Sequence, residues 1–145
     1  MASAAALYTP EVLALATGLA RYPLTGDLPL RGEARSKSCG STIEVGIAAD
    51  ANGTVERIGL RAHSCAIGQA AAGLFAAHAP GFDRSRIEAA HDQIALWLAG
   101  TRDAMPDWPG LAVLAAARAY PARHGAILLA WRAALAALST PPAAR

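Results

Sequence analysis

Apolar residues recur at two different spacings along the chain, and the change of spacing divides it into segments. Apolar side chains three and four positions apart predict an N-terminal helix over about residues 10–21, with Thr9 as its N-cap and Pro10 in its first turn. The stretch that follows is rich in Gly, Pro and Leu and is interpreted as a loop up to Lys37. Strict alternation begins after this loop, so the next elements are predicted to be strands.

The alternating segment predicts an antiparallel hairpin over about residues 42–63. Ile43, Val45 and Ile47 share one face of its first strand. The run Asp50-Ala51-Asn52-Gly53 predicts the turn, because Asn-Gly tolerates positive φ. The return strand divides its residues between two faces, with Ile58, Leu60 and Ala62 on one and Arg57, Arg61 and His63 on the other. Each face is only partly apolar, so we expect one side of the sheet to meet solvent.

Helical spacing returns after the hairpin and predicts a helical part over about residues 65–138. Pro80-Gly81 stops its first helix, Ser85 and Glu88 are spaced as a capping box for the next, and Tyr120-Pro121 separates the last two. Residues 139–145 are expected to form a loose tail. This order predicts a single α+β domain over residues 1–145, in which a small antiparallel sheet packs against helices on one face.

Composition and charge narrow the class of protein. The 145 residues are 54% hydrophobic and 17% charged, which excludes a disordered chain. A formal net charge of +2 makes no electrostatic case for nucleic acid as a partner. The N-terminus lacks the regions of a signal peptide, and residues 126–138 are too short and too interrupted by Arg132 to span a membrane. We therefore expect a cytoplasmic protein with no membrane partner, in which both cysteines are reduced.

The two cysteines are the sharpest candidates for chemistry. Cys39 stands just before the first strand of the hairpin, and Cys65 follows the second strand and opens a helix. If those strands pair, both thiols come to the same end of the sheet. A helix N-terminus favours a thiolate at Cys65, the form that binds metals and attacks sulfur. Two alternatives stay open: small buried hydrophobic residues, or a disulfide pair in a thiol redox protein.

The four histidines differ in their promise as ligands. His63 lies two residues before Cys65 on the polar strand face, and His124 starts the last helix. Both are candidate metal ligands, because histidine is a common ligand of zinc. His78, at a helix end, and His91, on a polar helix face, are expected to be solvated or to cap helices.

Other constellations are weak. The chain has no dinucleotide-binding, P-loop or serine-hydrolase motif, and its carboxylates form no paired site. Arg31, Arg35 and Lys37 form a modest basic patch before Cys39, which could dock an acidic partner or belong to an ordinary linker.

Three motifs stand in a fixed order. They are Ser38-Cys39-Gly40-Ser41 before the hairpin, His63-Ser64-Cys65-Ala66-Ile67 at the next helix, and Tyr120-Pro121-Ala122-Arg123 leading into residues 129–135. With these motifs and the 26-residue interval between its cysteines, the chain resembles the U-type iron–sulfur cluster assembly scaffolds of the Isc, Suf and Nif systems. The third motif is closest to the Suf-type segment, and the resemblance spans about residues 9–138.

The resemblance implies a compact α+β fold with three cysteines at one end. In the family these cysteines receive sulfur from a cysteine desulfurase and hold a nascent 2Fe–2S cluster or a zinc ion. Cys39 and Cys65 match the first two. The third falls on Ala126, an aspartate of the family falls on Ser41, and His124 stands one position away from the family's histidine.

The leading hypothesis is a divergent U-type scaffold that lacks the third cysteine. It would accept sulfur and bind iron, an iron–sulfur cluster or zinc through Cys39 and Cys65, with His124 or His63 completing the site. Because such a site needs about four ligands, we expect the metal to be weakly bound or partly water-ligated. The expected partners are a cysteine desulfurase and other cluster assembly or acceptor proteins, and the protein is expected to be a scaffold or sulfur acceptor rather than an enzyme.

The alternative from another class is a metal-free regulatory module that docks a cysteine desulfurase or a true scaffold. A purely structural helical protein is a further alternative, against which the hairpin and the thiols argue.

Overall fold

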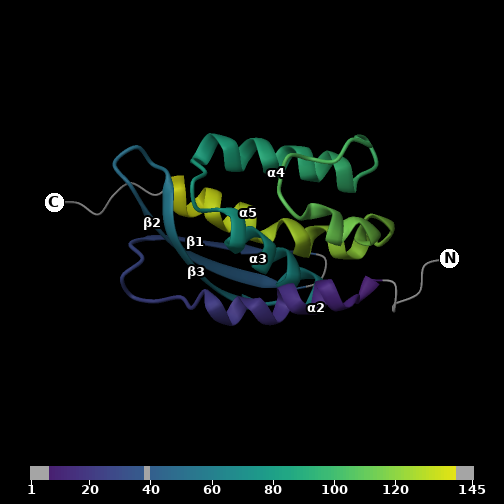
Figure 1. The fold of residues 1–145 in the computed structure, drawn as a ribbon, viewed down its shortest axis with the longest axis horizontal. Helices are drawn as coiled ribbons and strands as arrows, with labels where there is room; N and C mark the ends of the chain where they lie inside the picture. The colour runs from purple at the N-terminus through teal and green to yellow at the C-terminus, as the bar shows by residue number, and fades with distance from the viewer. Residues whose placement is uncertain (1–6, 38–39, 140–145) are drawn as a thin grey trace.

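A computed structural model describes residues 7–37 and 40–139 of the chain. In chain order its elements are α2 (Pro10–Thr17), the 3₁₀ helix η1 (Gly18–Arg21), β1 (Leu30–Arg35), β2 (Thr42–Ala49), β3 (Val55–His63), α3 (Ala66–His78), α4 (Arg84–Leu98), the 3₁₀ helices η2 (Leu111–Ala119) and η3 (Pro121–Arg123), and α5 (His124–Ser139). Figure 1 shows these elements as one α+β unit, so the predicted fold class is confirmed.

The predicted hairpin is present as β2 and β3, two strands of a three-stranded antiparallel sheet in the order β1-β2-β3. Its turn forms where expected, because Oδ1 of Asp50 accepts hydrogen bonds from the backbone N–H groups of Asn52 and Thr54, both at 2.9 Å. Gly53 adopts a φ of +82°, which an L side chain rarely tolerates. Local turn chemistry therefore sets the register of the two strands.

The third strand, β1, lies in the stretch interpreted from sequence as a loop, so that interpretation was wrong. Leu30, Gly32 and Ala34 alternate with charged residues, but small side chains weaken the apolar signal. The small residues are required because α5 passes very close to β1. A Cβ on Gly32 would lie 2.1 Å from the carbonyl oxygen of Ala133. The strand is thus recognisable only once its covering helix is known.

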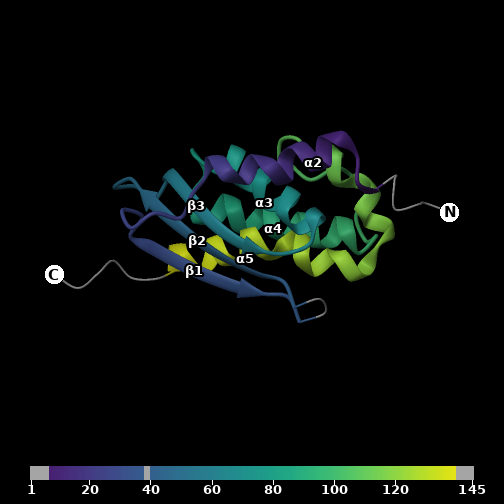
Figure 2. The same cartoon turned by 90° about the horizontal axis from the view of Figure 1, so that it is seen from below.

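Helices cover one face of the sheet, as predicted. α5 packs across β1 and β2, α3 packs beside β3, α4 lies outside α5, and α2 lies against α3 (Figures 1 and 2). The core between these layers is aromatic and aliphatic, and the rings of Phe75 and Trp108 stack with centroids 5.3 Å apart. The close packing of α2 on α3 depends on Gly73, where a Cβ would lie 2.2 Å from the carbonyl oxygen of Leu15.

The other face of the sheet is covered only in part. Gly46 and Gly59 pair across β2 and β3, and a Cβ on Gly59 would lie 2.2 Å from the carbonyl oxygen of Pro23. The segment after η1 therefore lies directly on this row of the sheet. Beyond it, Arg61 and His63 are exposed. The outer face meets solvent at the end that leads to Cys65.

Two local predictions about the helical part need correction. The N-cap of α4 is Asp83 rather than Ser85, because Oδ1 of Asp83 accepts from the N–H of Arg86 at 2.9 Å. The predicted tail also starts one residue too early, because α5 continues through Ser139; residues 140–145 lie outside the described part of the chain. Among the described residues, no helix combines the length and apolar character needed to cross a bilayer.

Candidate functional site

Cys65 lies at the junction of β3 and α3. It is the N-cap residue of α3, with extended backbone angles, and its side chain makes no capping hydrogen bond. The first backbone hydrogen bond of the helix runs from the N–H of Gln69 to the carbonyl oxygen of Cys65, at 2.9 Å. The thiol is free and partly buried. It is therefore available for chemistry at a helix N-terminus.

The loop between β1 and β2 closes at the same end of the sheet. Ser36 N–H donates to the carbonyl oxygen of Ser41 at 2.8 Å, and Gly40 N–H donates to the carbonyl oxygen of Ser36 at 3.1 Å. Ser64, which precedes Cys65, donates its hydroxyl to Oγ of Ser41 at 3.1 Å. Cys39 itself lies outside the described residues. Its neighbours Gly40 and Ser41 connect it to this end, and its meeting with Cys65 stays a prediction.

Three elements meet beside Cys65 at Ser64, Gly68 and Ala126. A Cβ on Gly68 would lie 1.9 Å from Oγ of Ser64 and 3.2 Å from Cβ of Ala126. The serine hydroxyl therefore fills the space that a larger residue on α3 would need. Ala126 is 2% exposed and belongs to this junction. The position that the resemblance aligns with a third cysteine thus lies at the Cys65 end and carries a methyl group.

His124 is held away from this junction. Its Nε2 lies 3.1 Å from the carbonyl oxygens of both Ala117 and Arg118, and since carbonyls only accept, Nε2 carries the proton. Two residues along a helix correspond to a rotation of roughly 200°, so His124 and Ala126 project from nearly opposite sides of α5. The ring lines a pocket of about 500 Å³ at the end of α4. Its metal role stays a prediction and requires the ring to leave both carbonyls.

The other histidines follow no single pattern. His63 is exposed at the end of β3, and within the described residues no side-chain contact engages its ring. His91 is less solvated than expected: its Nδ1 lies 3.0 Å from Oδ1 of Asp92, and its Nε2 accepts from Nε of Arg132 at 3.3 Å. Residues 7–37 and 40–139 contain no group of three His, Cys, Asp or Glu side chains able to hold a metal ion.

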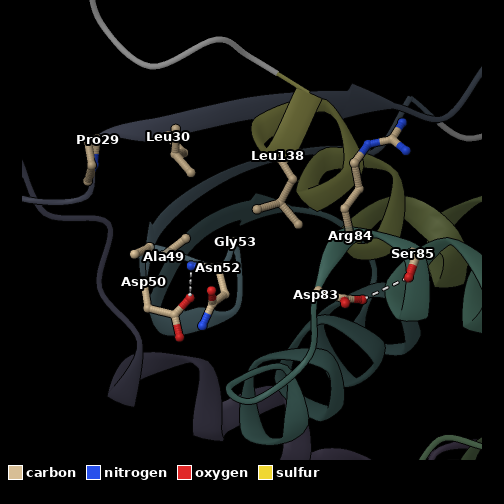
Figure 3. Close-up of a pocket in the computed structure, with 11 residues that line it drawn as sticks. Pro29, Leu30, Ala49, Asp50, Asn52, Gly53, Asp83, Arg84, Ser85 and Leu138 are labelled. Atoms are coloured by element: carbon tan, nitrogen blue, oxygen red, sulfur yellow. Dashed lines mark hydrogen bonds between the residues drawn. The ribbon is translucent and has the colours of Figure 1, made fainter.

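A pocket of about 630 Å³ lies at the opposite end of the sheet, between the hairpin turn and the start of α4 (Figure 3). Its two carboxylates have structural roles. Asp50 holds the turn, and Asp83 accepts from Ser85 Oγ at 3.0 Å as well as capping α4. The N–H of Arg86 and the hydroxyl of Ser85 hold the pKa of Asp83 below its usual value. These groups therefore support the fold and offer no competing reactive site.

Comparison with known proteins shows which solved structures share this fold. No known family profile matches the sequence, and no curated protein matches it. Among solved structures, a nitrogen-fixing NifU-like protein (N-terminal part) from Brucella abortus is similar, with a TM-score of 0.81, 24% identity and 92% of each chain covered. A protein assigned as an iron–sulfur cluster assembly scaffold for the SUF system of Fervidobacterium islandicum has a TM-score of 0.79 and 17% identity, over 92% of this chain and 97% of that one.

This chain has the U-type scaffold fold. A third solved structure, of a hypothetical protein, shares it with a TM-score of 0.69 and 19% identity, over 89% of this chain and 97% of that one. At these identities the likeness establishes the fold, and the fold predicted from the three sequence motifs is confirmed.

Within this U-type fold the described parts of the first two motifs and the start of α5, to which the third leads, lie at one end of the sheet. Gly40 and Ser41 close the first, His63 to Ile67 run from β3 into α3, and the third leads through η3 into the start of α5. Sequence reasoning found Cys65 but missed Ser64 and Gly68. Small residues flanking the cysteine were the available signal, and only their contacts with Ser41 and Ala126 give them a role.

Proposed function

We propose that this chain is a scaffold-like protein of iron–sulfur cluster assembly that accepts sulfur, and binds iron, a cluster or zinc, through Cys39 and Cys65. The observation that carries the proposal is the free, partly buried thiol of Cys65, set at the N-terminus of α3 and unused in capping. Ser41, which follows Cys39 by two residues, is hydrogen-bonded to Ser64 beside that thiol. The scaffold role assigned to the Fervidobacterium protein, which has the same fold, supports this function.

Sulfur transfer to such a thiol is a simple exchange. The thiolate of Cys65 attacks the terminal sulfur of a persulfide on a cysteine desulfurase. A new S–S bond forms on Cys65, the S–S bond of the enzyme breaks, and the enzyme cysteine leaves as a thiolate, so electrons and atoms balance without another oxidant.

Cluster or zinc binding at this end of the fold needs more ligands than two thiolates provide. A cluster or tetrahedral zinc takes about four, and Ala126 supplies none. His63, exposed two residues before Cys65, and His124, after release from its two carbonyl partners, are the proposed additional ligands. Metal held this way is expected to be weakly bound and partly water-ligated.

The test combines metal analysis with sulfur transfer. The chain is purified without oxygen, its iron and zinc are measured, and it is incubated with a cysteine desulfurase and cysteine before mass analysis of each thiol. We expect the parent chain to gain sulfur, and Cys65→Ser to lose most of that gain. Cys39→Ser should lose the bound metal. Ser85→Cys places an exposed thiol at the other end of the sheet and should gain no sulfur.

The result that removes this function is plain. If the parent chain holds no metal, supports no cluster reconstitution and takes no more sulfur at Cys65 than at the control thiol, the thiols have no role in cluster assembly.

A metal-free regulatory module is the second candidate. It is favoured by one observation: Ala126 cannot coordinate a metal, and the ring of His124 is engaged at two carbonyl oxygens. Such a module should still bind the desulfurase, or a true scaffold, after both cysteines are replaced by serine. Loss of binding in that double variant would rule the module out.

A further inference from the structure

The outer face of the sheet carries charges in rows that cross the three strands. At the end nearest Cys65, Arg35 pairs with Thr42, and Thr42 pairs with His63. These three residues lie on the face that points away from α5, because their neighbours Ala34, Ile43 and Ala62 take the helix side. Adjacent strands are about 4.8 Å apart, so Arg35 and His63 stand roughly 10 Å from one another across this row.

Two basic side chains at this end of the sheet, Arg35 and Lys37, have no charged partner among the described residues. Arg35 and His63 are exposed, and Lys37, in the loop just beyond β1, is exposed as well. Within the described residues no ion pair or side-chain hydrogen bond engages any of the three. Most other basic side chains of the sheet are paired: Arg61 binds Glu44 at 3.2 Å, and Arg57 binds Asp27 at 2.7 Å. The group formed by Arg35 and Lys37 is named the basic rim, and His63 stands at the far end of the same row.

The basic rim lies at the end of the sheet that leads to the free thiol of Cys65. Cys65 follows His63 by two residues, so their Cα atoms are at most about 7 Å apart. Ser41, next to Thr42 of the same row, is hydrogen-bonded to Ser64. The covering segment after η1 lies over the Gly46–Gly59 row further along the sheet and leaves the rim open. A surface that docks on the rim therefore comes close to the start of α3, where Cys65 lies.

We propose that the basic rim is the docking surface for a carboxylate-bearing segment of a partner protein, which it brings to Cys65. The inference rests on the proposed function only in naming Cys65 as the thiol that the partner must reach. Unpaired, exposed cations attract carboxylates and speed encounter without fixing a tight complex.

The next row of the sheet argues for a protein rather than a nucleic acid. This row contains Glu33, Glu44 and Arg61. Arg61 is paired with Glu44, so the carboxylate of Glu33 is the negative charge that follows immediately behind the cations of the rim. Alternate residues of a strand are about 7 Å apart, so the two rows are separated by about that distance. A uniform polyanion such as nucleic acid would be attracted by the cations of the rim and repelled by the carboxylate in the next row. A protein surface that pairs acidic with basic groups fits both rows.

The test uses peptides that react with the thiol without any enzyme or metal. Three peptides of equal length carry one cysteine, activated as a mixed disulfide with 2-thiopyridine and flanked by Glu, Gln or Lys. In the Cys39→Ser variant, the Cys65 thiolate attacks the peptide sulfur, the S–S bond breaks, and pyridine-2-thione leaves and is measured by absorbance. The rate for the Glu peptide relative to the Gln peptide reports the attraction at the rim.

We expect the Glu peptide to react faster by about three-fold for each carboxylate that faces a cation at roughly 7 Å in water. The ratio should fall towards one at about 1 M salt, where the Debye length is about 3 Å. It should also fall in Arg35→Gln/Lys37→Gln. Arg84→Gln/Arg86→Gln removes the same charge from exposed positions at the other end of the sheet and should leave the ratio unchanged.

Three results would overturn the inference. They are a Glu-to-Gln ratio near one at low salt, an equal fall of the ratio in both double variants, and tighter rim-dependent binding of single-stranded DNA than of the Glu peptide. Because the assay needs neither desulfurase nor metal, it separates this surface from the proposed function. If the chain takes up no sulfur from the desulfurase but still reacts faster with the Glu peptide, the docking surface is present and the proposed function is wrong. If it takes up sulfur but reacts equally fast with both peptides, the proposed function stands and the docking surface is refuted.

Discussion

Replacing Gly68 by Ala is the most direct test of the junction beside Cys65. The added Cβ would lie 1.9 Å from Oγ of Ser64 and 2.9 Å from its Cβ. Rotation of the serine side chain removes the first clash but breaks the 3.1 Å hydrogen bond to Ser41. The second clash survives every rotation, because the Cβ of Ser64 does not move with its own side-chain torsion. The backbone at the start of α3 must therefore shift.

The change in the free energy of unfolding can be worked out from these contacts. A lost hydrogen bond costs about 1 kcal/mol and overpacking typically costs about 1–3 kcal/mol, while alanine gains about 1 kcal/mol over glycine in a helix. We expect Gly68→Ala to lower the free energy of unfolding by about 1–3 kcal/mol. Ser64→Gly removes both clashing atoms and leaves the 3.2 Å approach to Cβ of Ala126, which is much less severe. The double variant should therefore be more stable than the two single losses predict, by about 1–2 kcal/mol.

Urea unfolding followed by tryptophan fluorescence measures all four proteins of this cycle, since the indoles of Trp97, Trp108 and Trp131 are buried. Gly73→Ala is the matched control. There the added Cβ meets the backbone carbonyl oxygen of Leu15 at 2.2 Å, so trimming that side chain should rescue nothing. If the losses at positions 64 and 68 add to within about 0.5 kcal/mol, the two residues do not share this space and the description of the junction is wrong.

Three further predictions test other parts of the fold and site. Gly32→Ala should lower the free energy of unfolding in urea by about 3 kcal/mol or more, because its Cβ would meet the α5 backbone at 2.1 and 2.4 Å. Gly26→Ala, whose Cβ meets nothing within 4 Å, is the control. Equal stability of the two variants would contradict the described packing of β1 on α5. Asp83 has a lowered pKa in the fold, so its charge stabilises the folded state above the ordinary value of 3.8 and this contribution disappears as pH falls through the folded pKa. The urea midpoint of the parent should therefore exceed that of Asp83→Asn at pH 7, and the difference should shrink as the pH falls below 3.8. A difference that stays constant would refute the cause. Ala126→Cys adds a thiol at the Cys65 end and should raise the affinity for zinc by about ten-fold or more, measured by competition with a chelator. Ala99→Cys is the control. If Ala126→Cys binds zinc no more tightly than this control, position 126 does not reach the site.

The fold was predictable where local chemistry and burial agree. The β2–β3 hairpin could be predicted because Ile43, Val45 and Ile47 alternate strictly and Asp50 begins a turn whose hydrogen bonds lie within five residues. β1 could not, since the same alternation is present but its inner positions include Gly32. The reason for that glycine is the backbone of α5, about a hundred residues later in the chain.

By itself, the sequence determined the two alternating strands, the helical half, and a cysteine at the boundary between them, because spacing and turn residues act over a few positions. Only the tertiary structure decided that Ser41 meets Ser64, that Ala126 lies against the first turn of α3, and that the ring of His124 binds carbonyls on the other side of α5. Those outcomes depend on how whole elements pack. A side chain at the start of a helix takes its direction from the helix's rotation against its neighbours, which no short stretch of sequence contains.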